Sequence, residues 1–183
     1  MKRIFASALL LAFGCAASAA YAALAVGAKA PDFTLQASMG GKDFTFKLSD
    51  ALKKGPVVLY FYPAAFTHGC TIEAHDFADA MDEYKALGAT VIGVSHHNIA
   101  TLEKFSTSEC RSKFPVAADT DQAVTKTYDA ILARAPQYAN RTSYVIAPSA
   151  KIVFTYTDLA PDNHVALTVQ AVKDWRDTHP SRK

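Results

Sequence analysis

The sequence predicts an α/β fold: a mixed central sheet flanked by helices on both faces, with a β-hairpin before it. Continuous apolar runs such as "GPVVLYFYP" at 55–63 are typical of strands that are buried on both faces of a sheet. Segments with apolar residues at helical spacing alternate with these runs. The last two apolar runs are separated only by "SA", which indicates an antiparallel pair. The sheet should therefore contain both parallel and antiparallel strands.

Each element follows from a local pattern. At 37–50, "ASMGGKDFTFKLSD" predicts the hairpin, because Gly40-Gly41 suits a tight turn and phenylalanines alternate after it. A long helix is expected at 67–87, where apolar residues recur at three- and four-residue spacing. The other expected strands lie at 89–95, 114–119, 142–148 and 151–157, and the other expected helices at 99–109, 120–130 and 162–179.

The composition is that of an ordinary globular protein. The 183 residues are 50% hydrophobic and 20% charged, which suits one domain with a single core. The formal net charge is +2, and lysines and arginines are scattered along the chain rather than grouped in a block. This distribution argues against a nucleic-acid surface.

Residues 1–22 have the features of a secretory signal peptide. Lys2 and Arg3 precede an apolar stretch at 4–17, and the small-residue series "SAAYA" follows it. This pattern predicts cleavage after Ala22 and a periplasmic or secreted location.

The remaining residues, 23–183, are expected to form a single domain without a membrane anchor. The N-terminal apolar stretch is shorter than the roughly 20 residues that a transmembrane helix needs. Lipid attachment at Cys15 is an alternative, because "AFGC" ends in Gly-Cys. Phe13 and Ala12 are poor residues ahead of a lipid-acceptor cysteine, so an ordinary signal peptide is preferred.

Cys70 and Cys110 are the cysteines that such a cleavage leaves. In an oxidising compartment the two could form a structural disulfide. Cys70, however, is expected at the beginning of the helix at 67–87. There, unsatisfied backbone N–H groups and the positive end of the helix dipole favour a thiolate. The sequence therefore also allows a reactive cysteine.

Residues around Cys70 suit a reactive site. Gly69 leaves space for a small molecule to approach the backbone. Thr67 places a hydroxyl about one turn from the sulfur, and Pro63 fixes the chain just beyond the preceding strand. A metal site is the other alternative, and it would use Cys70 with histidines. The candidates are His68, His75, His96 and His97.

That alternative is disfavoured. The chain has no Cys-x-x-Cys pair, and His96 and His97 are adjacent, so they are expected to point to different sides of a strand end. They are interpreted as polar loop residues.

The spacing Pro63-x-x-x-Thr67-x-x-Cys70 after a buried strand resembles the peroxidatic motif of peroxiredoxins. "VGAKAPDFTL" at 26–35, Glu73 and the later segment "RTSYVIAP" also match that family. The resemblance covers nearly all of the chain after the predicted signal peptide. It is closest to the Q-type, or bacterioferritin-comigratory-protein, subfamily.

The resemblance implies a thioredoxin-like fold and a thiol-dependent peroxidase that acts on hydrogen peroxide and small alkyl hydroperoxides. Cys70 would attack the peroxide and become a sulfenic acid. Arg141, which matches the arginine of the family, would stabilise the negative charge on the leaving oxygen together with Thr67. Glu73 would hold Arg141. No metal or organic cofactor is implied.

Two positions depart from the subfamily. His75 stands where many Q-type members have a resolving cysteine, and His68 stands where proline is common. Cys110 lies near the alternative position of a resolving cysteine, so the resemblance suggests a Cys70–Cys110 disulfide; otherwise the enzyme is a one-cysteine type. His68 is either an exposed loop residue or a titratable group that tunes the thiolate.

The expected partners are a peroxide and an external thiol or dithiol reductant, and the resemblance favours a monomer. The competing function is an exported thioredoxin-fold protein that exchanges disulfides or carries a metal. A disulfide exchanger needs Cys-x-x-Cys, and here Thr67 occupies the partner position. Glu73 could also serve only as a complement to the helix dipole.

Overall fold

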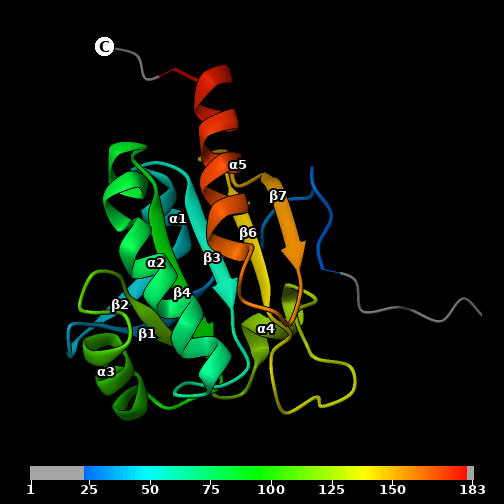
Figure 1. Ribbon diagram of the computed structural model, residues 1–183. Helices are drawn as coiled ribbons and strands as arrows, with labels where there is room; N and C mark the ends of the chain where they lie inside the picture. The colour runs from blue at the N-terminus through cyan, green and yellow to red at the C-terminus, as the bar shows by residue number, and fades with distance from the viewer. Residues whose placement is uncertain (1–22, 181–183) are drawn as a thin grey trace, which may run out of the picture.

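The computed structural model describes residues 23–180 and confirms a thioredoxin-like α/β fold (Figure 1). A seven-stranded sheet lies between two layers of helices. The strands are β1 (Thr34–Met39), β2 (Lys42–Lys47), β3 (Val57–Phe61), β4 (Thr90–Ser95), β5 (Val116–Ala118), β6 (Thr142–Ile146) and β7 (Ile152–Thr157). The helices are α1 (Leu48–Leu52), α2 (His68–Ala86), α3 (Ile99–Ser108), α4 (Ala123–Thr127) and α5 (His164–Thr178).

The sheet is mixed, as predicted, with the strand order β2-β1-β5-β4-β3-β6-β7. Strands β3, β4 and β5 run parallel, whereas β1, β2, β6 and β7 join by antiparallel pairs. In the β3–β6 pair, Phe61 at the end of β3 lies opposite Thr142 at the start of β6. The residues that follow β3 and those that precede β6 therefore leave the sheet at the same edge.

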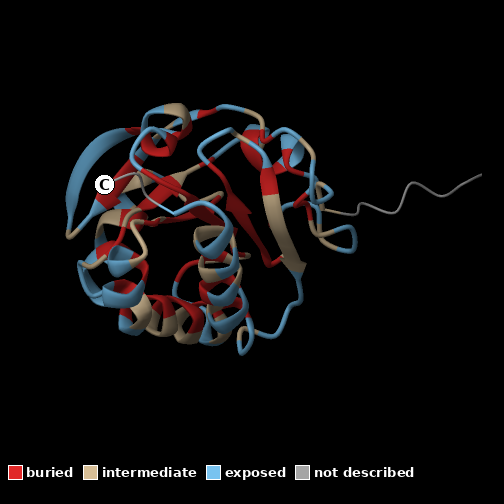
Figure 2. Cartoon of the chain, turned by 90° about the horizontal axis from the view of Figure 1, so that it is seen from above, coloured by how far each residue is buried: buried red, intermediate tan, exposed pale blue. Residues whose placement is uncertain are grey.

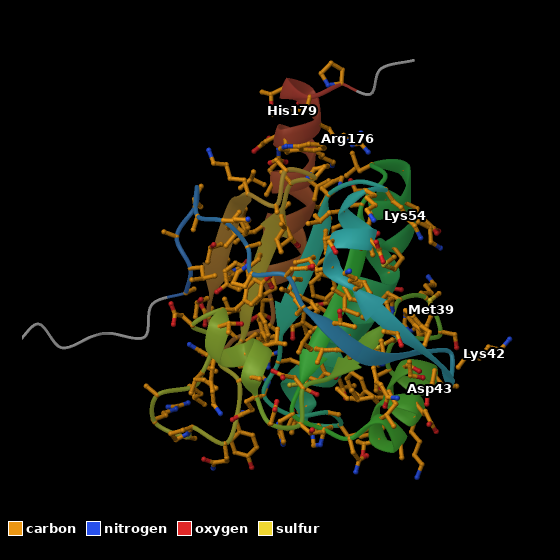
Figure 3. The ribbon with its side chains drawn as sticks, turned by 180° about the vertical axis from the view of Figure 1, so that it is seen from behind. Met39, Lys42, Asp43, Lys54, Arg176 and His179 are labelled. Atoms are coloured by element: carbon orange, nitrogen blue, oxygen red, sulfur yellow. The ribbon has the colours of Figure 1, made fainter. Side chains whose placement is uncertain are left out.

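The predicted hairpin is present as β1 and β2. Gly40 and Gly41 have φ angles of 58° and 73°, so both occupy the left-handed region that a two-residue hairpin turn requires. The Gly41 N–H donates to Ser106 Oγ of α3 at 3.0 Å. Figure 3 shows Met39, Lys42 and Asp43 at this outer end of the hairpin.

Strand β3 separates two hydrophobic clusters. Val57, Leu59 and Phe61 face the cluster that includes α1 and α4, whereas Val58 and Tyr60 face the cluster of α2, α3 and α5. This alternation is the two-residue period of a strand. Buried residues gather in the central strands and on the inner sides of the helices (Figure 2). The expectation of helices on both faces is confirmed.

Two helices differ from the prediction. The sequence predicts a hairpin that continues to residue 50, but Leu48–Leu52 form α1, whose five residues are too few to show a helical period. The helix predicted at 120–130 is shortened to α4, because Gln122 takes a left-handed φ of 57°. The buried Asp119 carboxylate accepts the N–H of Thr125 at 2.7 Å and so sets the start of α4.

Helix α5 packs beside α2. Figure 3 shows Arg176 and His179 at the far end of α5, and Arg176 Nε donates to the Leu87 carbonyl at the end of α2 at 2.6 Å. Within residues 23–180, no helix combines the length and the apolar character needed to cross a bilayer. The predicted signal peptide and its cleavage point at Ala22 lie outside the described residues.

Candidate active site

The candidate site lies where β3 leaves the sheet and α2 begins. Thr67 is the N-cap residue, with extended backbone angles of −79° and 151°, and α2 starts at His68. Phe66 has a φ of 63°, a conformation that costs an aromatic residue about 1–3 kcal/mol. Its ring packs edge-on against Phe105 of α3, with ring centroids 5.2 Å apart. The predicted helix start next to Cys70 is confirmed.

Cys70 is the third residue of α2 and its side chain is 2% exposed. This position places it among the first-turn N–H groups that have no partner within the helix. The Thr67 hydroxyl donates to the Ala64 carbonyl at 2.8 Å. The lone pairs of that hydroxyl therefore remain free to accept a hydrogen bond from a substrate. Pro63 is half-buried in the loop before it.

Arg141 is the residue just before β6, and its side chain contacts the Cys70 sulfur. Its Nη2 donates to Cys70 Sγ at 3.5 Å, its Nε donates to the Leu159 carbonyl at 2.9 Å, and its Nη1 donates to Glu73 Oε2. Arg141 is 4% exposed and Glu73 is fully buried. The structure therefore brings together Cys70, Arg141 and Glu73, three of the residues that the sequence singled out.

Gly69 has a steric role at this contact. A Cβ atom at position 69 would lie 3.1 Å from Arg141 Nη2, so a larger residue would push the guanidinium away from the sulfur. Burial opposes the charge on Arg141, but Glu73 and the Cys70 sulfur outweigh this and raise its pKa. Arg141 is therefore a fixed cation directed at the thiol.

Cys110 lies in a different environment. It is fully buried directly after α3, and its N–H donates to the Phe105 carbonyl at 3.0 Å. Burial, and secondarily Glu109, raises the pKa of the Cys110 thiol. Among residues 23–180, Cys70 and Cys110 are both free thiols. The next residues, Arg111 and Ser112, both have left-handed φ angles of 50° and 57°.

The histidines do not form a metal centre. His68 is exposed at the start of α2, and His75 Nε2 pairs with Glu109 Oε2 at 3.0 Å. The prediction that His96 and His97 point to different sides is wrong: their rings lie 4.3 Å apart, because they follow β4 in a bend rather than within the strand. The part of the chain in the structure contains no group of three or more possible metal ligands.

Two buried residues near Glu73 escaped the sequence analysis. His164, the first residue of α5, and Ser143 of β6 are both fully buried. Their side chains contact each other, with 2.8 Å between Ser143 Oγ and His164 Nδ1. The sequence predicts a helix at 162–179, but no local pattern distinguishes a buried histidine at its start from an exposed one.

A buried thiol at a helix N-terminus that faces a guanidinium is the arrangement of a nucleophilic cysteine with a group that can stabilise developing negative charge. Residues 26–155 match the AhpC/TSA family, so the chain belongs to this family and is a peroxiredoxin, a thiol-dependent peroxidase.

Relatives cover most of the chain. Peroxiredoxin Bcp of Bacillus subtilis is 31% identical over 157 residues, which cover 83% of this chain and 97% of that protein. Chloroplastic peroxiredoxin Q of Triticum aestivum is 33% identical over 149 residues, covering 81% of this chain and 66% of the wheat protein. Among solved structures, peroxidoxin BcpB from Mycobacterium tuberculosis has a TM-score of 0.74 at 28% identity, covering 81% and 96% of the two chains. The match to Bcp and peroxiredoxin Q supports the subfamily that the sequence suggested.

Proposed function

We propose that this peroxiredoxin reduces hydrogen peroxide and small alkyl hydroperoxides outside the cytoplasm through Cys70. The observation that carries the chemical part is the contact between Arg141 Nη2 and Cys70 Sγ at 3.5 Å. A guanidinium at this distance can hold both the sulfur and a peroxide oxygen in its planar fork. The substrate needs to be small at its reacting end, because Cys70 is almost fully buried.

In the peroxide step, the Cys70 thiolate attacks the terminal oxygen of R–O–O–H. A sulfur–oxygen bond forms as the oxygen–oxygen bond breaks, which leaves a sulfenic acid on Cys70 and an alkoxide or hydroxide that takes up a proton. Negative charge develops on the leaving oxygen, where Arg141 and the first-turn N–H groups of α2 can stabilise it. Loss of one such donor typically raises the barrier by about 3–4 kcal/mol.

Cys110 is proposed to resolve the sulfenic acid by forming a disulfide with Cys70. A disulfide requires Cβ atoms only about 4 Å apart. Both cysteines are buried, one in the first turn of α2 and the other directly after α3, and we propose that these two segments open locally as the disulfide forms. The left-handed residues Arg111 and Ser112 make the turn after Cys110 a strained segment that suits such opening. An external thiol or dithiol then reduces the disulfide.

The first experiment measures peroxide consumption by residues 23–183 with dithiothreitol as reductant. We expect turnover with hydrogen peroxide and with tert-butyl hydroperoxide, and none for Cys70→Ser. Absence of turnover in the wild type, or equal turnover in Cys70→Ser, contradicts the proposal.

Export and assembly state need separate tests. The charged and apolar pattern of residues 1–22 supports secretion. Fractionation of cells that express the full chain, followed by N-terminal sequencing, should find mature protein outside the cytoplasm that begins at Ala23. The protein is proposed to be a monomer, so light scattering after gel filtration should give the mass of one chain. A larger mass contradicts the monomeric state.

A further inference from the structure

Tyr60 and Tyr62 are fully buried on the face of the sheet that α2 and α3 cover, and neither hydroxyl has a hydrogen-bond partner among residues 23–180. Ser95 Oγ lies near the Tyr62 hydroxyl, but the two do not have the geometry of a hydrogen bond, and Ser95 Oγ is also unpaired within these residues. A buried tyrosine hydroxyl usually has a partner, so the two exceptions need an explanation.

The other fully buried tyrosines of the described chain are paired. Tyr84 Oη is 2.7 Å from Thr168 Oγ1, and Tyr128 Oη donates to the Pro31 carbonyl at 2.6 Å. Tyr144 Oη donates to the Tyr128 carbonyl. The fold thus provides hydrogen bonds for three buried tyrosine hydroxyls, and the two that lack them lie side by side at the end of β3.

Tyr60 packs against the helix that carries Cys70. Its ring stacks on Phe77 of α2, with ring centroids 4.4 Å apart, and Phe77 lies about two helical turns beyond Cys70. The Tyr60 hydroxyl lies over Gly93 of β4, where a Cβ atom would be 2.7 Å from the oxygen. The Gly93 N–H already donates to the Pro115 carbonyl at 3.1 Å, so this position gives the hydroxyl space rather than a partner.

Tyr62 packs against the segment that ends at Cys110. Its ring stacks on Phe105 of α3, with ring centroids 5.4 Å apart, and the Phe105 carbonyl accepts the Cys110 N–H at 3.0 Å. Both tyrosines and both cysteines belong to one hydrophobic cluster. The two unpaired hydroxyls therefore lie beneath the two segments that carry the thiols.

An unpaired hydroxyl raises the free energy of the protein only while it is covered, because water can hydrogen-bond to it once the cover opens. The proposed resolving step includes a local opening of the first turn of α2 and the end of α3. The free energy of such an opening is the difference between the closed and the opened arrangement. Hydroxyls that lack partners only in the closed arrangement make this difference smaller.

We propose that the hydroxyls of Tyr60 and Tyr62 promote this opening and so set the rate at which Cys110 resolves the Cys70 sulfenic acid. The two tyrosines are positioning residues that act through the packing of α2 and α3. In the step itself a sulfur–sulfur bond forms, the bond between the Cys70 sulfur and its hydroxyl oxygen breaks, and that oxygen leaves as water with the Cys110 thiol proton. The inference rests on the proposed function, because resolution by Cys110 is part of it.

The first test measures the melting temperature of the reduced protein. Tyr60→Phe and Tyr62→Phe each remove only the hydroxyl, and their double variant should melt above the wild type, because a buried unpaired group is lost. Tyr84→Phe is the matched control: it lies in the same cluster but loses a hydrogen bond, so it should melt below the wild type. A double variant that melts at or below the wild-type temperature overturns the proposal.

The second test follows disulfide formation after one equivalent of hydrogen peroxide, by intact mass in timed samples. The double variant should form the disulfide about tenfold more slowly than the wild type, and Tyr84→Phe should stay within about twofold. Competition with a haem peroxidase measures the peroxide step, which the double variant should slow by less than about threefold. Equal slowing of both steps, or an unchanged rate of disulfide formation, contradicts the proposal.

The third test measures the opening without peroxide. In the Cys70→Ser background, alkylation of Cys110 by iodoacetamide requires the end of α3 to open, because Cys110 is fully buried. Adding Tyr60→Phe and Tyr62→Phe should slow alkylation by about tenfold, and adding Tyr84→Phe should not slow it. An alkylation rate that the two substitutions leave unchanged overturns the inference. Slower alkylation, in a protein whose wild type forms no disulfide with peroxide, contradicts the proposed resolving role of Cys110 instead.

Discussion

The two cysteines of the described domain are equally buried but chemically opposite. Cys70 is 2% exposed and Cys110 is 0% exposed. Cys70 lies at the N-terminus of α2 with Arg141 at 3.5 Å, whereas Cys110 follows the C-terminus of α3 beside Glu109. The partial charge of a helix is positive at its N-terminus and negative at its C-terminus. The two thiols therefore lie in opposite electrostatic environments, and we propose that the cation and the helix N-terminus are what make Cys70 the reactive one.

The largest expected effect separates the two thiols directly. Cys70→Ser should lower the rate of the peroxide step by about 10⁴-fold or more, as expected for loss of a nucleophile. Cys110→Ser should leave this step unchanged within about twofold, because the hydrogen bonds of the Arg141 side chain go to Cys70, Glu73 and Leu159 rather than to Cys110. Stopped-flow or competition kinetics with hydrogen peroxide measure both variants.

The fate of the sulfenic acid provides the matched control. After one equivalent of peroxide, the intact mass of the wild type should decrease by two hydrogens, and that of Cys110→Ser should increase by one oxygen. A wild type that gains oxygen and forms no disulfide would show that Cys110 does not resolve Cys70.

The second prediction removes the cation that distinguishes Cys70. Arg141→Ala should lower the rate of the peroxide step by about 10²–10³-fold, since one charge-stabilising donor is lost. Arg141→Lys should recover only part of this rate, because an ammonium cannot reproduce the planar fork that contacts sulfur, Glu73 and Leu159 together. Full activity in Arg141→Lys would show that the site needs only the positive charge at this position and not the planar guanidinium.

A third, smaller effect concerns the inertness of Cys110. Because burial raises its pKa, Cys110 in Cys70→Ser should react with iodoacetamide at pH 8 about 100-fold more slowly in the folded protein than in urea. Mass spectrometry of timed samples measures both rates. Comparable rates in the two states would mean that the end of α3 opens freely in the reduced protein.

The smallest effect tests what holds Cys110 in place. Its neighbours Glu109 and Arg111 pair with His75 and Asp79, which lie one turn apart on α2. Asp79→Ala should accelerate disulfide formation by about twofold and lower the free energy of unfolding by less than about 1 kcal/mol, because the pair is largely exposed. Asp82→Ala is the control, since the ion pair of Asp82 among residues 23–180 is with Lys85 of the same helix. Equal effects in both variants would show that the Asp79–Arg111 ion pair does not hold Cys110 in place.

Local sequence patterns predicted the part of the candidate site that lies within one continuous chain segment. Strand β3, the start of α2 and the position of Cys70 follow from an apolar run and a helical period within about 30 residues. Arg141 is 71 positions beyond Cys70, and only the family resemblance linked the two. The β3–β6 pairing that joins them is a long-range property that no local pattern encodes.

Three features of the structure were not predicted from the sequence, and each has a physical cause. Helix α1 has only five residues and takes its stability from Leu48, Ala51 and Leu52 packing into the core. His164 is buried only because α5 packs against β6 and β7. The rings of His96 and His97 lie side by side because the chain bends after Ser95. For α1 and His164, tertiary packing rather than the local sequence decides the outcome.

The pairing of Phe61 with Thr142 has a consequence for how the sequence can diverge during evolution. Cys70 lies in the first turn of α2, shortly after β3, and Arg141 lies directly before β6. Strands β3 and β6 are joined by main-chain hydrogen bonds, and such bonds do not depend on side-chain identity. Substitutions elsewhere in the sheet can therefore accumulate without altering the spacing of sulfur and guanidinium. An insertion of one residue in β3 or β6 would shift the register and turn the core side chains to the opposite face. The site should thus tolerate divergence in sequence but not in strand length.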